Sequence, residues 1–313
     1  MPLRIVFMGT AELACASLLA LKRQPGFHLV AVVTQPDKPV GRHLRLQPSP
    51  VKQTALAENI PVLQPGRARD ENFIAELRRL QPDLIVVAAY GQILPPAILE
   101  LPRHGCLNVH TSLLPKYRGA SPIQSAILND ESETGVTIMK IDAALDTGDI
   151  LTQTATPIRA DDNAQTLHDR LAQLGAELLA RTIPDHVAGK ILPRPQPAAG
   201  ASHCAKIKKS DGQLDWNLPA RVLWNRIRAF TPWPGAFTHF PAAPQPRLLK
   251  IWRVEIVERS GPPGEILAAP PGILVACGQN ALNLIELQLE GGRRLAAREF
   301  LAGHSLPPGL KLG

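Results

Sequence analysis

The segment Cys106-Leu107-Asn108-Val109-His110-Thr111-Ser112-Leu113-Leu114-Pro115 decides how the rest of the chain is interpreted. Apolar residues in its first half predict a short strand that ends with Asn108 and His110. A second strand is predicted at 135–139, and the loop after it carries Asp142 and Asp146. In open parallel sheets, ligands bind outside the carboxyl ends of the strands, so we expect the chemistry of this protein here.

Three motifs in this region occur together and in order. Asn-x-His-x-Ser-Leu-Leu-Pro spans 108–115, Lys-Tyr-Arg-Gly-Ala-Ser-Pro follows at 116–122, and Leu-Asp-Thr-Gly-Asp spans 145–149. In this combination the chain resembles the folate-dependent formyltransferases. The resemblance implies 10-formyltetrahydrofolate as the formyl donor and no metal. The alternative is that His110 only caps a strand and Asp146 only caps a turn.

The resemblance implies that Asn108, His110 and Asp146 are catalytic. Formyl transfer is an acyl transfer in which negative charge grows on the formyl oxygen, so donors near that oxygen stabilise the transition state. Asn108 offers an amide donor, and protonated His110 would offer a charged one. The resemblance implies that Asp146 holds the imidazole, raises its pKa and relays protons.

Two further loops are expected to bind the folate. The resemblance assigns this role to Ser112, Leu113, Leu114 and Pro115, and to Tyr90, Gln92, Ile93 and Leu94. Ile93 and Leu94 could equally be ordinary core residues. Asp142 either contacts the pterin or caps a turn. The Gly-x-Ser-x-Gly pattern of a hydrolase nucleophile is absent, and Ser112 has no evident partners for a triad.

The first half of the chain alternates predicted strands and helices. Strands are expected at 3–8, 29–33 and 83–89, and helices at 11–23, 70–80, 121–128 and 166–183. This order predicts an α/β fold with a Rossmann-like, doubly wound and mostly parallel sheet. No G-x-G-x-x-G motif follows the first strand, which removes the main support for a nicotinamide-dependent oxidoreductase.

The segment 34–52 is rich in proline and in basic residues. Its prolines and Gly41 predict a loop without regular structure beside the active site. The segments 35–42 and 48–52 resemble a loop that methionyl-tRNA formyltransferases use against the acceptor arm of initiator tRNA. That resemblance implies tRNA contacts for Lys38, Arg42, His43, Arg45 and Lys52, with Arg42 clamping the acceptor end; the alternative is a solvated basic loop.

The last third of the chain is the more basic part. Residues 1–206 hold 21 Lys and Arg against 19 Asp and Glu, whereas residues 207–313 hold 13 against 8. Alternating patterns near 252–256 and 285–290 predict half-buried strands of a small OB-like β-barrel. We therefore expect a catalytic domain at 1–189, a linker at 190–205 and a tRNA-binding domain at 206–313. Its expected tRNA contacts include Lys206, Lys208 and Lys209.

Composition limits the cellular setting. The four cysteines among the 313 residues are far apart in sequence, which predicts neither zinc nor disulfides and favours a reducing compartment. No apolar run approaches the roughly 20 residues of a membrane span. The sequence therefore predicts a cytoplasmic protein with no membrane association, and a monomer suits a two-domain clamp on tRNA.

Related enzymes share this core but use different acceptors. The basic loop, the second domain and the basic last third favour initiator methionyl-tRNA as the acceptor. The runner-up is an amino-sugar nucleotide, since such enzymes can keep the second domain. A glycinamide ribonucleotide enzyme would be shorter, and a non-catalytic RNA-binding protein would not need Asn108, His110 and Asp146 intact.

Overall fold

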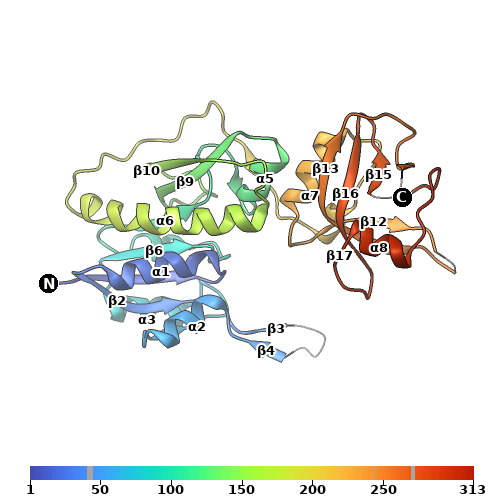
Figure 1. Ribbon diagram of the computed structural model, residues 1–313. Helices are drawn as coiled ribbons and strands as arrows, with labels where there is room; N and C mark the ends of the chain where they lie inside the picture. The colour runs from blue at the N-terminus through green and yellow to red at the C-terminus, as the bar shows by residue number, and fades with distance from the viewer. Residues whose placement is uncertain (41–44, 243, 269–271) are drawn as a thin grey trace. The chain divides into compact units, whose positions relative to one another are not determined.

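A computed structural model describes residues 1–40, 45–242, 244–268 and 272–313 (Figure 1). The chain forms two compact units whose segments interleave along the sequence. The first unit comprises Met1–Pro122, Glu133–Pro157 and His168–Cys204, and the second comprises Ile123–Ser132, Ile158–Leu167 and Ala205–Gly313. The expected boundaries at 189 and 206 stay a prediction.

The first unit is built on a seven-stranded sheet in the order β10-β9-β7-β6-β1-β2-β5. Neighbours among β5, β2, β1, β6 and β7 run parallel, while β9 is antiparallel to both β7 and β10. The predicted Rossmann-like, mostly parallel sheet is therefore confirmed. The strands are β1 (Leu3–Gly9), β2 (Phe27–Val33), β5 (Val62–Leu63), β6 (Leu84–Ala88), β7 (Cys106–His110), β9 (Glu133–Lys140) and β10 (Ile150–Pro157).

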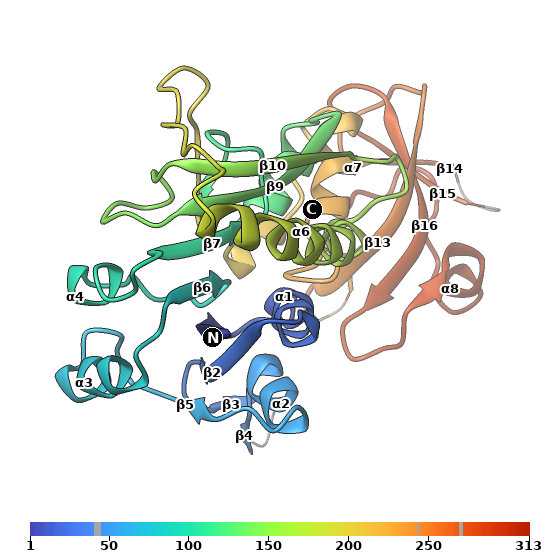
Figure 2. The same ribbon diagram turned by 90° about the vertical axis from the view of Figure 1, so that its left-hand side faces the viewer.

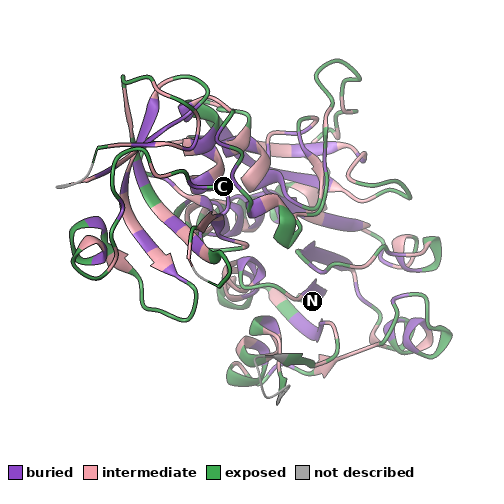
Figure 3. Ribbon diagram, turned by 90° about the vertical axis from the view of Figure 1, so that its right-hand side faces the viewer, coloured by how far each residue is buried: buried purple, intermediate pink, exposed green. Residues whose placement is uncertain are grey.

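Helices cover both faces of this sheet, which explains why its central strand β6 is apolar throughout. In Figure 2, α3 and α4 lie on one side of the strands, and α1 and α2 lie on the other. All five residues of β6 are buried, and buried residues concentrate in the strands (Figure 3). The helices of the first unit are α1 (Leu13–Arg23), α2 (Pro50–Ala57), α3 (Glu71–Leu80), α4 (Pro96–Leu99) and most of α6 (Ala164–Val187), whereas α5 (Pro122–Leu128) lies almost wholly in the second unit. None of the helices in the described ranges is both long and apolar enough to cross a membrane.

The prediction that residues 34–52 lack regular structure was wrong. They contain a short antiparallel hairpin, β3 (Lys38–Val40) with β4 (Arg45–Gln47), and the start of α2. Proline is favourable at the first turn of a helix, and Ser49 caps this one by accepting a hydrogen bond from the Lys52 amide at 3.0 Å. Arg42 and His43 lie outside the described residues.

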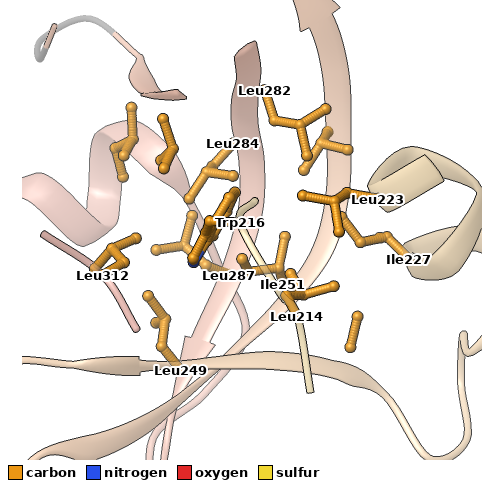
Figure 4. Close-up of a cluster of buried hydrophobic side chains, with 14 of the residues drawn as sticks. Leu214, Trp216, Leu223, Ile227, Leu249, Ile251, Leu282, Leu284, Leu287 and Leu312 are labelled. Atoms are coloured by element: carbon orange, nitrogen blue, oxygen red, sulfur yellow. The ribbon is translucent and has the colours of Figure 1, made fainter. Parts of the chain in front are cut away.

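The second unit is a curled antiparallel sheet with its own core, consistent with the predicted OB-like domain. Its strand order is β12-β13-β16-β15-β14, and β17 pairs with β16. Trp216 lies within this core, where its indole nitrogen donates to Thr238 at 3.0 Å (Figure 4). The elements are η1 (Lys209–Gly212), α7 (Ala220–Ala229), β12 (Ala236–Phe240), β13 (Arg247–Val257), β14 (Ile266–Ala268), β15 (Ile273–Ala276), β16 (Ala281–Leu289), β17 (Leu295–Ala296) and α8 (Ala297–Gly303).

The predicted alternation at 252–256 is present in β13. Val254 is buried and Trp252 and Ile256 are half-buried, whereas Arg253 and Glu255 are exposed. The phase differs just before this run, where Ile251 is buried. Register shifts lie between Ile251 and Arg253 and between Arg253 and Val254. A bulge adds a residue to one strand, so the inward-facing positions change parity across it.

Two short segments of the second unit pack on α7 although they lie far away in sequence. Arg221 forms an ion pair with Asp130 at 2.7 Å. Arg228 donates to the carbonyl oxygens of Asp162 and Arg159, both at 2.6 Å. Both guanidinium groups also lie over the Trp224 ring, 4.5 and 4.0 Å from its centroid. These contacts tie segments 123–132 and 158–167 to α7.

Candidate active site

Strand β7 presents the first two members of the candidate site. Asn108 and His110 are two residues apart on a strand, so their side chains lie on one face of the sheet. The amide of Asn108 donates to Oδ1 of Asp146 at 3.3 Å, and Nδ1 of His110 lies 3.7 Å from Oδ2 of Asp146. The backbone amide of Gly119 also donates to Oδ2, at 2.9 Å. The structure thus brings the three predicted catalytic residues together around one carboxylate.

Asp146 reaches this position from an unexpected direction. Because β9 is antiparallel to β7, the loop after β9 begins beside Cys106, whose carbonyl accepts from the Ile141 amide at 2.8 Å. The expectation that Asp146 follows a strand at the shared carboxyl edge was therefore wrong. The loop instead folds back toward Asn108, with Asp146 in the left-handed region at φ 53°. Few non-glycine residues adopt this conformation unless their surroundings hold them there.

Contacts within the loop favour this conformation. The hydroxyl of Thr147 donates to both carboxylate oxygens of Asp142, at 2.8 and 2.7 Å, and the Ala144 amide donates at 3.2 Å. The backbone at Gly148 passes so close to Lys140 that an added Cβ would clash with the carbonyl oxygen of Lys140. Of the two predicted roles of Asp142, the turn-closing one is therefore present in the structure.

His110 is buried, and its two ring nitrogens face different partners. Nε2 lies 2.9 Å from the carbonyl oxygen of Tyr117, which only accepts, so this nitrogen carries the proton. Burial lowers the pKa of His110 below its usual value, although the charge of Asp146 and the Tyr117 carbonyl act in the opposite direction. Asp146 thus raises the pKa of His110, as predicted, but desolvation outweighs the carboxylate and the net direction is downward. Nδ1 is then the nitrogen able to accept a proton.

The loop expected to bind folate, residues 112–115, is held by polar contacts from two strands. The hydroxyl of Thr137 donates to the Ser112 carbonyl at 2.7 Å and accepts from the Leu114 amide at 3.1 Å. The amide of Gln153 donates to the Leu114 carbonyl at 2.9 Å. Sequence reasoning missed Thr137 and Gln153, because a polar residue in a strand gives no sign of which loop it holds.

Side chains in that loop differ in exposure. Ser112 is fully buried and donates to the Lys116 carbonyl at 2.6 Å, and Leu114 is also buried. Leu113 and Pro115 are half-buried. Leu113, Pro115 and the backbone are therefore better placed for the expected folate contact than the buried Ser112 hydroxyl.

The second expected folate loop, residues 90–94, has a similar division. Ile93 is 80% exposed, so the alternative that it is a core residue was wrong, whereas Leu94 is buried. Tyr90 is buried and burial raises its pKa to about 12, and among the described residues its hydroxyl has no hydrogen-bond partner. Gln92 accepts from the Ala68 amide at 2.7 Å, which fixes the loop.

The residues expected to contact tRNA fall into two groups. Lys52 is paired with Asp37 at 2.8 Å, while Lys38 is exposed and donates to the side chain of Gln35. Arg45 lies in β4. In the second unit, Lys206, Lys208 and Lys209 are all exposed. Among the described residues, no three His, Cys, Asp or Glu side chains cluster so as to hold a metal.

Comparison with known proteins identifies the class to which this fold and site belong. Residues 3–183 match the formyl transferase family, and residues 206–305 match the C-terminal domain of formyl transferases. The chain belongs to the formyl transferase family.

Relatives over the full length carry one particular name. Methionyl-tRNA formyltransferase of Citrifermentans bemidjiense is 51% identical over 99% of this chain and 96% of its own. The enzymes of the same name from Caldanaerobacter subterraneus subsp. tengcongensis and Myxococcus xanthus are each 49% identical over 98% of this chain. They are covered over 99% and 96% of their own lengths.

Solved structures share the fold at low identity. WlaRD, a sugar 3N-formyl transferase, has a TM-score of 0.65 and 20% identity, with 94% of this chain and 100% of that chain covered. HypX from Aquifex aeolicus, solved with tetrahydrofolic acid, has a TM-score of 0.64 and 17% identity. That match covers 96% of this chain and 47% of HypX.

Proposed function

We propose that this chain transfers the formyl group of 10-formyltetrahydrofolate to the free amino group of initiator methionyl-tRNA. The observation that carries the proposal is the identity of about half of all positions, over nearly the whole chain, to enzymes named methionyl-tRNA formyltransferase. The similarity to sugar formyltransferases concerns the fold at 20% identity. An amino-sugar nucleotide is therefore an outcome to test.

In the proposed reaction the amine nitrogen attacks the formyl carbon, a tetrahedral species forms, and the folate nitrogen leaves with a proton. The amide of Asn108 is a neutral donor suited to the oxygen on which charge develops. Since Nε2 of His110 is committed to the Tyr117 carbonyl, Nδ1 takes up the proton that the amine loses and gives it to the departing folate nitrogen, which leaves the imidazole neutral again. Asp146, 3.7 Å away, stabilises the imidazolium that exists between these two transfers.

The folate is proposed to lie against the loops 112–115 and 90–94. The exposed side chain of Ile93 supports this placement, because the flat pterin ring is largely apolar on its faces. The tRNA is proposed to contact the hairpin β3–β4 and the exposed lysines of the second unit, which together supply positive charge for backbone phosphates. The protein is proposed to act as a cytoplasmic monomer.

One experiment tests the reaction and the acceptor together. Donor labelled in the formyl group is supplied with charged initiator methionyl-tRNA or, separately, with an amino-sugar nucleotide. We expect label on the methionyl-tRNA alone. Label on the sugar alone would overturn the proposed acceptor, and release of labelled formate without transfer would indicate hydrolysis. Light scattering of the purified protein tests the monomer.

A further inference from the structure

The segment between α6 and the second unit runs back across the catalytic loops. We call residues 194–204 the strap. Arg194 and Ile150 exchange two backbone hydrogen bonds, at 2.8 and 2.9 Å. At the other end, β11 (His203–Cys204) pairs in parallel with β8 (Arg118–Gly119). The strap therefore belongs to the first unit, and it touches the segment whose Gly119 amide donates to Asp146.

Gln196 is the residue of the strap that reaches the catalytic loop. Its amide nitrogen donates to the carbonyl oxygens of Asp146 at 2.9 Å and Gly148 at 2.8 Å. Its amide oxygen accepts from Nε and from a terminal nitrogen of Arg118, at 3.0 and 2.8 Å. Gln196 is half-buried, whereas all the remaining residues of 194–201 are exposed. The side-chain amide of Gln196 thus donates two hydrogen bonds to the loop 141–149 and accepts two from Arg118.

These bonds act on a residue whose backbone lies in the left-handed region. Asp146 has a φ of 53°, and Gln196 binds the carbonyl of that same residue. The carboxylate of Asp146 must meet Asn108, His110 and Gly119 at once, so a rotation of its peptide would disturb all three contacts. Misplacement of a reacting group by about 1 Å can lower a rate about 100-fold.

We propose that Gln196 is a positioning residue, which holds the loop of Asp146 in its catalytic geometry by binding the Asp146 and Gly148 carbonyls. Arg118 fixes the other side of the same amide, so the strap, the loop 141–149 and β8 are joined through one side chain. The inference rests on the proposed function, because Asp146 takes part in the proposed transfer.

The test compares three variants of the full chain. Gln196→Met keeps the size of the side chain and removes all four hydrogen bonds. Gln196→Glu keeps the acceptor for Arg118 but cannot donate to the two carbonyls. Gln173→Ala is the matched control, because Gln173 is an exposed glutamine on α6. Thermal unfolding of each variant sets an assay temperature at which all are folded.

Two readouts are measured, kcat and KM for formyl transfer and the pH titration of His110 by NMR. We expect both Gln196 variants to lower kcat about 10- to 100-fold with little change in KM, and the control to match the original protein. In Gln196→Met we also expect the pKa of His110 to fall, because a displaced Asp146 raises it less.

Several results would overturn the inference. In Gln196→Met, an unchanged kcat, an unchanged His110 titration or a change confined to KM would each do so. A Gln196→Glu variant with the original kcat would also overturn it, because the contact with Arg118 would then be the one that matters. The titration needs no substrate. If the unmodified protein formylates no methionyl-tRNA, the proposed function fails, and the titration still decides the role of Gln196.

Discussion

Nδ1 of His110 lies 3.7 Å from Oδ2 of Asp146, while Nε2 of the same ring is bound to the carbonyl of Tyr117. The imidazole therefore has one fixed proton and one position at which a proton can be added or removed beside a carboxylate. Burial keeps the ring neutral to lower pH than usual, and the carboxylate limits that effect. This balance leads to the first prediction.

Asp146→Asn is expected to lower the pKa of His110 further. The substitution removes the charge that raises this pKa and leaves the burial that lowers it. NMR titration of the His110 imidazole measures the shift. The control is Asp149→Asn, three residues along the same loop, which should leave the titration in place. A His110 pKa that is unchanged or higher in Asp146→Asn would contradict this prediction.

Asn108→Ala is expected to lower kcat about 100- to 1,000-fold, the range found when one donor to a developing oxyanion is removed. Equilibrium binding of methionyl-tRNA should be unchanged, because the amide acts on the formyl oxygen. The variant loses one bond to Asp146, at 3.3 Å, so the His110 titration is recorded as well. A loss that appears only in tRNA binding would exclude the donor role.

Tyr90→Phe is expected to leave the unfolding free energy unchanged or to raise it by about 1 kcal/mol. The Tyr90 hydroxyl is buried and has no hydrogen-bond partner in the part of the chain that the structure describes, and such a group costs stability that phenylalanine would not. Urea unfolding measures the change. Tyr90→Ala is the contrast, since it opens a cavity in the core and should cost about 3 to 5 kcal/mol. Destabilisation by phenylalanine would reveal a partner for the hydroxyl.

Lys38→Met and Lys52→Met are expected to affect tRNA binding differently. Lys38 donates to the neutral side chain of Gln35, whereas Lys52 is paired with both oxygens of Asp37. Loss of one phosphate contact lowers the slope of log affinity against log salt by about 0.7 to 0.9. We expect this change for Lys38→Met and little change for Lys52→Met. Equal changes would show that tRNA displaces Asp37 from Lys52.

The sequence predicted the sheet from local signals, because apolar runs mark the buried strands. The candidate catalytic roles of Asn108, His110 and Asp146 came from the family resemblance, and the structure shows that the three residues lie together. The direction of the Asp146 loop depends on the antiparallel pairing of β9, which no local pattern specifies. Gln196 was missed for the same reason, since it lies 50 residues away in a segment that has the composition of a linker.

Other differences arise from tertiary context. The sign of the His110 pKa shift depends on how deeply the ring is buried, and spacing in sequence does not report that. The parity of β13 depends on a bulge formed with β16. In residues 34–52, two of the prolines that predicted irregular structure lie in regular elements, because Pro50 begins α2 and Pro39 lies in β3.

The contacts of α7 with segments 123–132 and 158–167 restrict how such a gene can recombine. A crossover near residue 205 would exchange residues 205–313 as one block. Arg221 and Arg228 on α7 would then come from one parent and their partners in segments 123–132 and 158–167 from the other. Chimaeras that also carry segments 123–132 and 158–167 from the donor of α7 would keep these contacts matched. The residues that must be exchanged together are therefore discontinuous along the chain.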